Sequence, residues 1–441
     1  MLSSPLHALS DVLPLAGIDR LAEHLPQAWI EEALEATGSA SIRRRRLPAE
    51  QVVWLVIALA LYRHQSMPEV LATLDLALPN RSEGTVSKSA VTQARQRLGV
   101  APLAWLFGRT AQSGCRQDAA RHAWKGLSLW AMDGTTLRTP DSPENRAHFG
   151  AQAYASGKIA SYPQVRAVSL TAIPTHLVGD MVFGAYGQNE MLYAKTLLEG
   201  IPDHSLTVFD RGFLSAEILL GLSLKGTQRH DLIPAKSNTK WERLSGTEDD
   251  GWVRLRVSPQ ARNKAADLPE YWTARAVRVV GANGKMRVLL TSLTDQRRFQ
   301  AQELAECYRR RWEIETSYRE LKQSMLGGAL TLRSQQPQGI EQEIWGALIA
   351  YNLVRLEMAK AAIVAKVEPT DLSFVRALHI LQHEMIWAVG MAPGKLPAHL
   401  IRLRIQMQFA VVEKRRGRQS PRVVKARPAR YTVRFLKKDL N

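Results

Sequence analysis

Apolar residues in the first quarter of the chain recur at helical spacing. A continuous apolar run over residues 52–62 follows a proline, and proline suits the first turn of a helix. Further along, Ser87 or Ser89 can cap a short helix over residues 90–98, and Gly99 can end it. This part of the chain is therefore predicted to be helical.

Short apolar runs replace the helical spacing after Gly126. Residues 127–132 and 206–209 form compact apolar runs with the length of buried strands. Neighbouring stretches predict two more strands, at 162–173 and 176–183, and two helices, at 189–199 and 214–224. Strands followed by helices along the chain predict a mixed α/β core.

The pattern changes again in the middle of the chain. Residues 236–251 are polar and predict a loop, whereas residues 252–257, 271–280 and 285–293 have the texture of strands. Asn283 and Gly284 form a strong hairpin signal between the last two strands. This stretch predicts a β-rich insertion, after which helical spacing returns at 298–325, 340–365, 372–389 and 396–409.

These patterns divide the chain into five predicted parts. They are a helical N-terminal domain (1–120), the first part of an α/β core (121–235), a β-rich insertion (236–297), the second part of the core (298–335) and a helical C-terminal region with a basic tail (336–441).

The charge of the chain points to a polyanionic partner. Its 441 residues include 59 Lys and Arg against 41 Asp and Glu, a formal net charge of +18. One basic run comprises Arg43, Arg44, Arg45 and Arg46, and the tail over residues 414–438 is basic with no acidic residue. A single run of this kind is as compatible with a solvated surface as with binding to phosphates. Two runs at opposite ends favour contacts with phosphates.

Other classes of protein fit the sequence poorly. The longest apolar run, residues 52–62, is shorter than the roughly 20 residues that span a bilayer. The first residues lack the basic and apolar regions of a signal peptide. Cys115 and Cys307 are the only cysteines, which excludes a disulfide scaffold and a cysteine-based zinc site. We therefore expect a cytoplasmic protein without a membrane partner.

The predicted helix over residues 90–98 is a candidate for reading DNA. It carries Gln93, Arg95, Gln96 and Arg97, side chains that can bind base edges when a short helix enters a groove. The alternative is a surface helix of a small bundle.

Asp133 and Asp210 each follow a predicted buried strand. Carboxylates at the ends of neighbouring strands can converge, and hard oxygen ligands suit Mg²⁺. An aspartate at the end of a strand, considered alone, is usually a turn former or a helix cap.

The segment 308–322 carries the most specific pattern. On a helical wheel, one narrow stripe contains Tyr308, Arg311, Glu315, Arg319 and Lys322. Glu313 lies away from this stripe. A carboxylate flanked by cations along one helix face suits a metal site beside a phosphate backbone. The alternative is an amphipathic helix in which Glu315 forms local ion pairs.

At these residues the chain resembles a known family. The spacing Tyr308-x2-Arg311-x3-Glu315-x6-Lys322 matches the Y-R-E-K signature of DDE transposases of the insertion sequence four family. WAMDGT at 130–135 and LTVFDRGF at 206–213 resemble the family's regions around its first and second catalytic aspartates. The resemblance covers nearly the whole chain, from about residue 10 to the tail.

The resemblance implies a ribonuclease H-like core interrupted by the β-rich insertion. Asp133, Asp210 and Glu315 would bind two Mg²⁺ ions, with Mn²⁺ as a possible substitute. Tyr308, Arg311 and Lys322, with Arg319 on the same stripe, would hold phosphates. The implied reaction is cleavage of terminal inverted repeats and strand transfer into target DNA, by a homodimer on double-stranded DNA at the bacterial nucleoid.

Relatives in this family cut the second strand through a hairpin with a flipped base, which needs an aromatic platform. Four tryptophans are candidates, and each could instead serve packing: Trp241, Trp252, Trp272 and Trp312. Two other functions stay open at this point. One is a structure-selective nuclease with the same acids and no strand transfer, and the other is a non-catalytic, basic DNA-binding protein.

Overall fold

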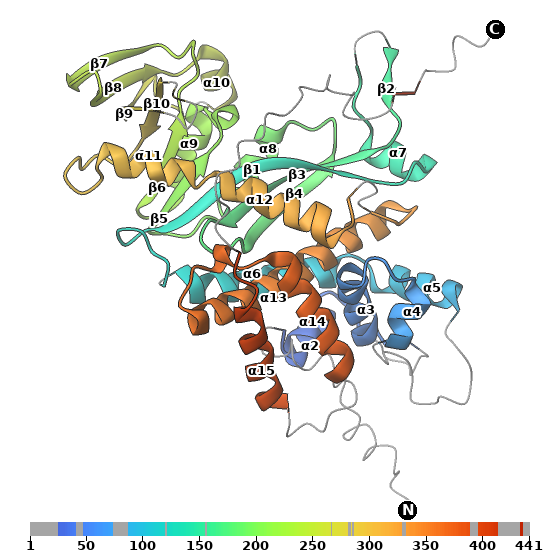
Figure 1. Cartoon of the computed structure of the whole chain (residues 1–441). Helices are drawn as coiled ribbons and strands as arrows, with labels where there is room; N and C mark the ends of the chain where they lie inside the picture. The colour runs from blue at the N-terminus through green and yellow to red at the C-terminus, as the bar shows by residue number, and fades with distance from the viewer. Residues whose placement is uncertain are drawn as a thin grey trace, which may run out of the picture.

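In the computed structural model, a large sheet lies beside a body of helices (Figure 1). The structure describes residues 25–40, 47–73, 87–119, 121–154, 157–265, 267–280, 284, 286–328, 332–388, 396–412 and 433–434. Helices and strands alternate through the middle of the chain, which confirms the predicted mixed α/β class.

The N-terminal region is helical, as its pattern predicts. Its described helices are α2 (Gln27–Ala36), α3 (Ala49–Leu61), α4 (Met67–Thr73), α5 (Lys88–Leu98) and α6 (Ala101–Ala119). The Ser87 hydroxyl accepts the Ala90 N–H at 3.2 Å and caps α5, and Gly99, with φ 73°, ends it. Of the two candidate caps, Ser87 is therefore the one used.

Nine strands among the described residues form one sheet in the order β4-β3-β1-β5-β6-β10-β9-β8-β7. Their bounds are β1 Ser128–Arg138, β3 Gln164–Ala172, β4 Val178–Ala185, β5 Ser205–Phe209, β6 Arg229–Pro234, β7 Trp241–Gly246, β8 Asp250–Arg256, β9 Tyr271–Val280 and β10 Met286–Thr291. The pairs β1–β5 and β5–β6 are parallel, and the other pairs are antiparallel. A separate short pair joins β2 (Ile159–Ala160) to β11 (Val433–Arg434).

The β-rich stretch extends the central sheet. Strand β10 pairs with β6, so β9, β8 and β7 continue outward in the same sheet. The prediction that residues 236–251 form a loop is wrong, because β7 occupies Trp241–Gly246. This edge strand is exposed along most of its length, so its sequence lacks the apolar alternation that marks a buried strand.

Each face of the sheet has its own helices. Helices α8 (Glu190–Leu197) and α9 (Ala216–Leu224) pack against the face that includes Trp130, Met132 and Phe209. Helices α11 (Ala301–Arg309) and α12 (Trp312–Arg319) cover the opposite face, which includes Ala131 and Val208. Shorter helices are α7 (Pro143–Phe149) and α10 (Pro259–Lys264).

The N-terminal and C-terminal helices share one hydrophobic core. The long helix α13 (Pro337–Ala365) packs against α3 and α6 on one side and α14 (Phe374–Ala388) and α15 (Leu396–Gln408) on the other. A Cβ added at Gly346 would lie 2.7 Å from a Val56 methyl group, so α3 and α13 pack closely there. The expected N-terminal domain, residues 1–120, is thus part of a larger helical body in the described residues.

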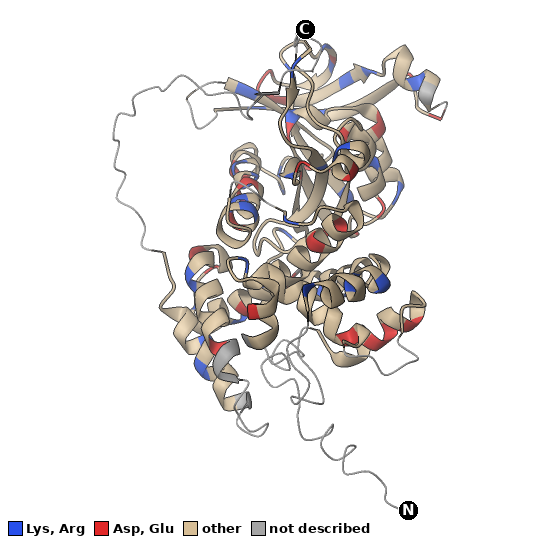
Figure 2. Ribbon diagram, turned by 90° about the vertical axis from the view of Figure 1, so that its right-hand side faces the viewer, with Lys and Arg blue, Asp and Glu red and all other residues tan. Residues whose placement is uncertain are grey.

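Charge is spread over the described molecule. Lys and Arg occur on the sheet, on its extension and on the helices (Figure 2). The two basic runs, at Arg43 to Arg46 and over residues 414–438, lie outside the described residues apart from Val433–Arg434. No helix within the described ranges is long and apolar enough to cross a membrane.

Candidate active site

Asp133 and Asp210 lie at the same level of the sheet. The parallel ladder between β1 and β5 ends at the pair Met132–Phe209, and each aspartate is the next residue in its chain. The prediction that the first strand ends at Asp133 is wrong. Strand β1 continues to Arg138 because β3 still pairs with it, whereas β5 stops and its chain turns away.

Asp210 also caps the turn that follows it. Its Oδ2 accepts the Gly212 N–H at 3.3 Å, at the start of a short 3₁₀ turn over Arg211–Phe213. The capping role that the sequence allowed for this aspartate is therefore present together with its position beside Asp133.

The Asp133 carboxylate is mostly buried, with 22% of the side chain exposed. Oδ1 accepts the Gly134 N–H at 2.8 Å, and Oδ2 pairs with the Arg311 guanidinium at 3.4 Å. Burial raises the pKa of Asp133 to about 6, because the two favourable contacts only partly offset desolvation and the Asp210 charge lies nearby.

This pKa predicts a pH-dependent effect of Asp133→Asn on stability. The carboxyl binds its proton more tightly folded, at about 6, than unfolded, at about 3.9, so ionisation destabilises the native state as pH rises through that window. Without metal, the variant should be more stable than wild type by about 1–3 kcal/mol at pH 8 and close to wild type at pH 4. Thermal unfolding in a chelating buffer measures this, and equal shifts at both pH values would contradict it.

Glu315 reaches the aspartates through Arg311. The Glu315 Oε1 accepts a hydrogen bond from Arg311 at 2.8 Å, and the same guanidinium contacts Asp133. Arg311 thus stands between two of the predicted catalytic acids as their counter-ion. In the part of the chain that the structure describes, no three His, Cys, Asp or Glu side chains are close enough together to hold a metal ion.

The predicted single helix over residues 298–325 is interrupted. Helix α11 ends at Arg309, a tight turn follows in which the Arg311 N–H bonds to the Tyr308 carbonyl at 3.0 Å, and α12 begins at Trp312. A π-helix then occupies Glu320–Met325. Irregular helical turns of this kind are frequent at functional sites, where they change the direction of a side chain. A helical wheel assumes a constant rotation per residue, so it does not predict them.

All four residues of the Y-R-E-K pattern nevertheless face the acids or their strand. Tyr308 lines a cavity together with Asp210, and burial raises its pKa. Lys322 Nζ donates to the Thr135 hydroxyl at 3.2 Å, two residues after Asp133. The two other candidates on α12 are exposed to solvent: Arg319 and Trp312, of which the tryptophan is 62% exposed.

Tyr318 is a site residue that the sequence reasoning missed. Its buried hydroxyl donates to the Asp133 carbonyl at 2.6 Å and lies 2.8 Å from the Ser169 hydroxyl. The contact joins α12 to β1 at the aspartate itself. Its position three residues after Glu315, on a neighbouring part of the same helix face, was the available signal.

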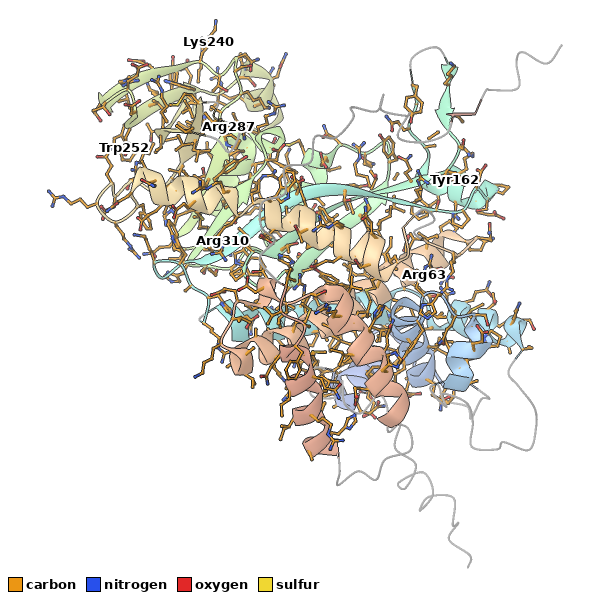
Figure 3. The ribbon with its side chains drawn as sticks, viewed as in Figure 1. Arg63, Tyr162, Lys240, Trp252, Arg287 and Arg310 are labelled. Atoms are coloured by element: carbon orange, nitrogen blue, oxygen red, sulfur yellow. The ribbon has the colours of Figure 1, made fainter. Side chains whose placement is uncertain are left out.

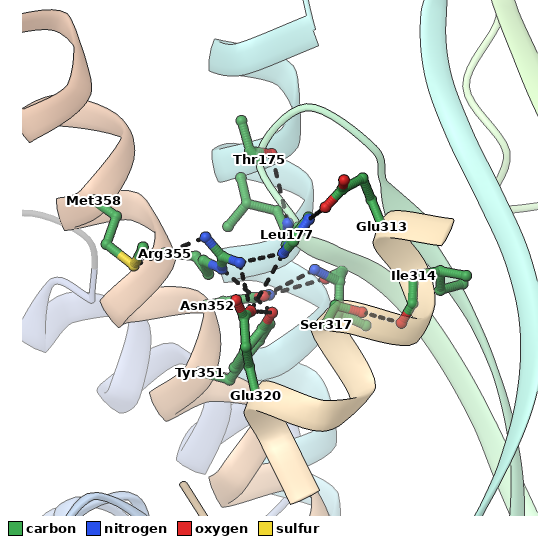
Figure 4. A network of polar contacts seen from close by, with 12 residues as sticks. Thr175, Leu177, Glu313, Ile314, Ser317, Glu320, Tyr351, Asn352, Arg355 and Met358 are labelled. Carbon is green, nitrogen blue, oxygen red and sulfur yellow. Dashed lines mark hydrogen bonds and ion pairs between the residues drawn. The ribbon is translucent and has the colours of Figure 1, made fainter. Parts of the chain in front are cut away.

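A buried polar network fixes the other side of α12 (Figure 4). The Arg355 guanidinium of α13 contacts Glu320, His176 and the Tyr351 hydroxyl, and His176 Nε2 lies 2.8 Å from Glu313. His176 has φ 60°, in the left-handed region, on the turn between β3 and β4. The network therefore ties α13 and the β3–β4 turn to the helical segment that carries Glu315.

A cavity of about 980 Å³ separates Asp210 and Tyr308 from the sheet extension. Among its lining residues are Lys236, Trp241 and Arg287. Figure 3 labels Arg287 and Lys240 on that extension. This cavity therefore places cations and two aromatic side chains, Trp241 and Tyr308, directly beside Asp210.

Only one of the four candidate tryptophans lines this cavity. Trp241 does so from β7, whereas Trp272 is buried in the core with 9% of its surface exposed. Trp252 is half-buried on β8, and Trp312 points to solvent on α12.

The predicted DNA-reading helix is α5, and one of its residues is placed differently from the expectation. Arg95 is bonded to α13 and the segment before it, through Gln342, Ser334 and the Gly339 carbonyl at 3.1–3.3 Å. Because its donors are used within the protein, the expectation that Arg95 contacts base edges of DNA is not supported. The remaining candidates are exposed: Gln93, Gln96 and Arg97.

Two families match the chain. Residues 15–108 match the family described as insertion element 4 transposase N-terminal. Residues 124–353 match the transposase DDE domain, a range that includes Asp133, Asp210 and the whole of segment 308–322.

Curated relatives match over most of the chain. It is 40% identical over 413 residues to the transposase InsG for insertion sequence element IS4 of Escherichia coli (strain K12), covering 93% of this chain and 92% of that protein. It is 37% identical over 249 residues to the putative transposase InsZ of the same organism, covering 56% of this chain and 82% of that protein.

One solved structure is similar over much of its length. The piggyBac transposase, in a cryo-EM structure of its synaptic complex with hairpin DNA, aligns with a TM-score of 0.42 and 11% identity, covering 89% of this chain and 86% of that one.

Proposed function

This chain belongs to the insertion element 4 family of DDE transposases and is an insertion-sequence transposase, and we propose that Asp133, Asp210 and Glu315 form the site where it cuts and joins DNA. The observation that carries the assignment is the shared end of the β1–β5 ladder, which puts two of the acids side by side. Arg311 links the third acid to them. The strand order β4-β3-β1-β5-β6 supports a ribonuclease H-like core with the remaining strands as its insertion.

The side chains fit a hard divalent cation, because Asp133, Asp210 and Glu315 offer carboxylate oxygens. We assign Mg²⁺ as the natural ion, two per site, with Mn²⁺ as a substitute. Bound there, such ions activate the attacking oxygen and stabilise the leaving oxygen at phosphorus. Asp133 and Asp210 would hold the ions from the sheet and Glu315 from α12, once Arg311 is drawn away toward a phosphate.

The neighbouring residues position the DNA. Lys322 and Arg311 are cations at the acid pair and would bind phosphates of the terminal nucleotides, with Arg319 further along the exposed side of α12. Tyr308 lines the cavity beside Asp210. Tyr318 fixes the position of α12 relative to β1. It thereby maintains the distance between the carboxylates of Glu315 and Asp133.

The partners are double-stranded transposon ends and target DNA, bound by a homodimer in the bacterial cytoplasm at the nucleoid. Helix α5 would read the interior of each end through Gln93, Gln96 and Arg97. The basic runs at 43–46 and 414–438 would add phosphate contacts, which makes binding steeply salt-dependent.

A joining assay tests this function. The full chain with Mg²⁺ and a labelled end substrate should first release a 3′-hydroxyl and then form products joined to a target plasmid. Cleavage without joined product would instead favour the structure-selective nuclease. Specific binding without any metal-dependent cleavage would favour the non-catalytic DNA-binding protein.

Trp241→Ala should slow the second-strand step selectively. If Trp241 is the platform for a flipped base, its loss removes stacking of about 1–3 kcal/mol, which slows hairpin formation roughly 5- to 150-fold. First-strand nicking should be unchanged, because that step precedes base flipping. A denaturing gel separates the two products.

Trp252→Ala is the matched control, since Trp252 lies on the adjacent strand and does not line the cavity. Equal slowing by the two variants would show that the sheet extension, and not this ring, controls the step.

A further inference from the structure

A fourth carboxylate lies against the strand that carries Asp133. Glu190 is the first residue of α8, and its Oε1 overlaps the position that a Cβ would take at Gly134. Only a glycine leaves room for the carboxylate there. Gly134 thus leaves open the space that the Glu190 carboxylate occupies.

The fold aims Glu190 at this point. Asn189 caps α8, its Oδ1 accepting the Met191 N–H at 3.0 Å, and this fixes the first turn of the helix. Helix α8 packs on β3 and β4, on the sheet face opposite α12. Because β5 ends opposite Met132, no strand among the described residues pairs with β1 on that side beyond this residue, and a side chain from α8 can approach the acid pair.

The Glu190 carboxylate makes no close polar contact in the described part of the chain, although the charge of Arg166 lies near it. It accepts no hydrogen bond and forms no ion pair there. The cation in its vicinity, Arg166, donates instead to the Gln188 carbonyl at 2.9 Å and stacks over the Tyr186 ring at 4.5 Å. Burial raises the pKa of Glu190; the charge of Arg166 lowers it in part, and the charge of Asp210 raises it.

A purely structural role for Glu190 would be to stabilise α8 by interacting with the dipole at the N-terminus of the helix. An acidic residue in the first turn stabilises a helix by about 0.3–1 kcal/mol when exposed. That role is satisfied with the side chain in solvent. It gives no reason to bring the carboxylate onto Gly134, beside Asp133 and Asp210, where like charges repel.

We propose that Glu190 is a fourth acidic residue of the active site and supplies a further oxygen donor to a divalent cation held by Asp133 and Asp210. The inference rests on the proposed function. Without a cation, repulsion keeps the carboxylates from closing into a cage, which agrees with their arrangement in the described residues. A cation would draw them together from the two faces of the sheet.

The test is Mn²⁺ binding by the full chain without DNA, followed by the electron paramagnetic resonance signal of free Mn²⁺. Glu190→Gln should weaken binding about tenfold, the scale seen when a supporting group of a metal site is lost. Asp133→Asn should weaken it further. The matched control is Asp180→Asn, a half-buried acid on β4 whose pKa burial also raises, and it should bind as wild type does.

The outcomes distinguish a failure of this inference from a failure of the proposed metal site. If Asp133→Asn weakens binding and Glu190→Gln binds as tightly as wild type, the inference fails and the proposed function stands. If wild type binds no Mn²⁺, or Asp133→Asn binds as wild type does, the proposed metal site fails and takes the inference with it.

Gly134→Ala gives an independent test. Its methyl group occupies the place of the Glu190 oxygen, so it should also weaken Mn²⁺ binding about tenfold. If it acts by displacing Glu190, the double variant Gly134→Ala/Glu190→Gln should be no weaker than the weaker single variant. Additive losses would overturn the proposal. Should Gly134→Ala fail to fold, the comparison of Glu190→Gln with Asp180→Asn still decides.

Discussion

Replacing Glu315 by glutamine is expected to lower the rate of end cleavage by about 10³-fold, corresponding to several kcal/mol of lost transition-state stabilisation. Glutamine keeps the size of the side chain and its hydrogen bond to Arg311 but removes the charge that a cation requires. End binding should be retained, because it depends on cations spread over the chain. Single-turnover cleavage and a gel-shift titration measure the two quantities.

Glu313→Gln is the matched control, the same substitution two residues earlier on α12. Its side chain is turned away from Asp133 and lies 2.8 Å from His176, and a glutamine oxygen can still accept a hydrogen bond there. Cleavage should therefore stay within about threefold of wild type. Equal loss of cleavage in both variants would refute the assignment of Glu315.

Arg355→Met is expected to destabilise the protein by about 3–5 kcal/mol. The Arg355 side chain is buried, with 1% exposed, and it is the cation that balances Glu320. Arg355 and His176 together hold the pKa of Glu320 down at about 2, against the opposing effect of burial. Methionine fills much of the same volume, so the loss reflects an unpaired buried charge more than a cavity. Thermal and urea-induced unfolding at pH 7 would measure it.

The second substitution Glu320→Gln should restore more than half of that stability, because it removes the charge left unpaired. Arg309→Met is the surface control. Its pair with Glu306 is more than half exposed, and its loss should cost under about 0.5 kcal/mol. If the double variant is no more stable than Arg355→Met, the network stabilises through packing and not through charge.

Local signals in the sequence were sufficient for much of the fold. Ser87 and Gly99 bound α5 because caps act within one helical turn. Strand β9 coincides with its predicted range of 271–280 because aromatic and β-branched residues run along it and most of its residues are buried. The exposed edge strand β7 escaped prediction because hydrogen bonding to β8, and not burial, holds it in place.

The sequence predicted those residues of the candidate site that belong to short motifs, and not those that depend on contacts between distant parts of the chain. Asp133, Asp210 and Glu315 followed from motifs, and the adjacency of β1 and β5 then places the first two. Arg95 could not be judged from its own helix, since its partners lie some 240 residues away on another one. Glu190 begins the predicted helix over 189–199 with no motif to mark it, and only the packing against Gly134 reveals what its carboxylate faces.

The packing of α3 against α13 has a consequence for how the protein is made. Every residue of α3 from Val52 to Leu61 is buried, yet its partner helix begins at Pro337, 276 residues after α3 ends (337 − 61 = 276). At about 5–20 residues per second, a ribosome needs roughly 15–55 s to synthesise that interval. During that time the nascent N-terminal helices carry an uncovered apolar surface. The folding of this half of the molecule is thus set by the timing of translation, and a chain truncated before α13 would remain a client of chaperones and proteases.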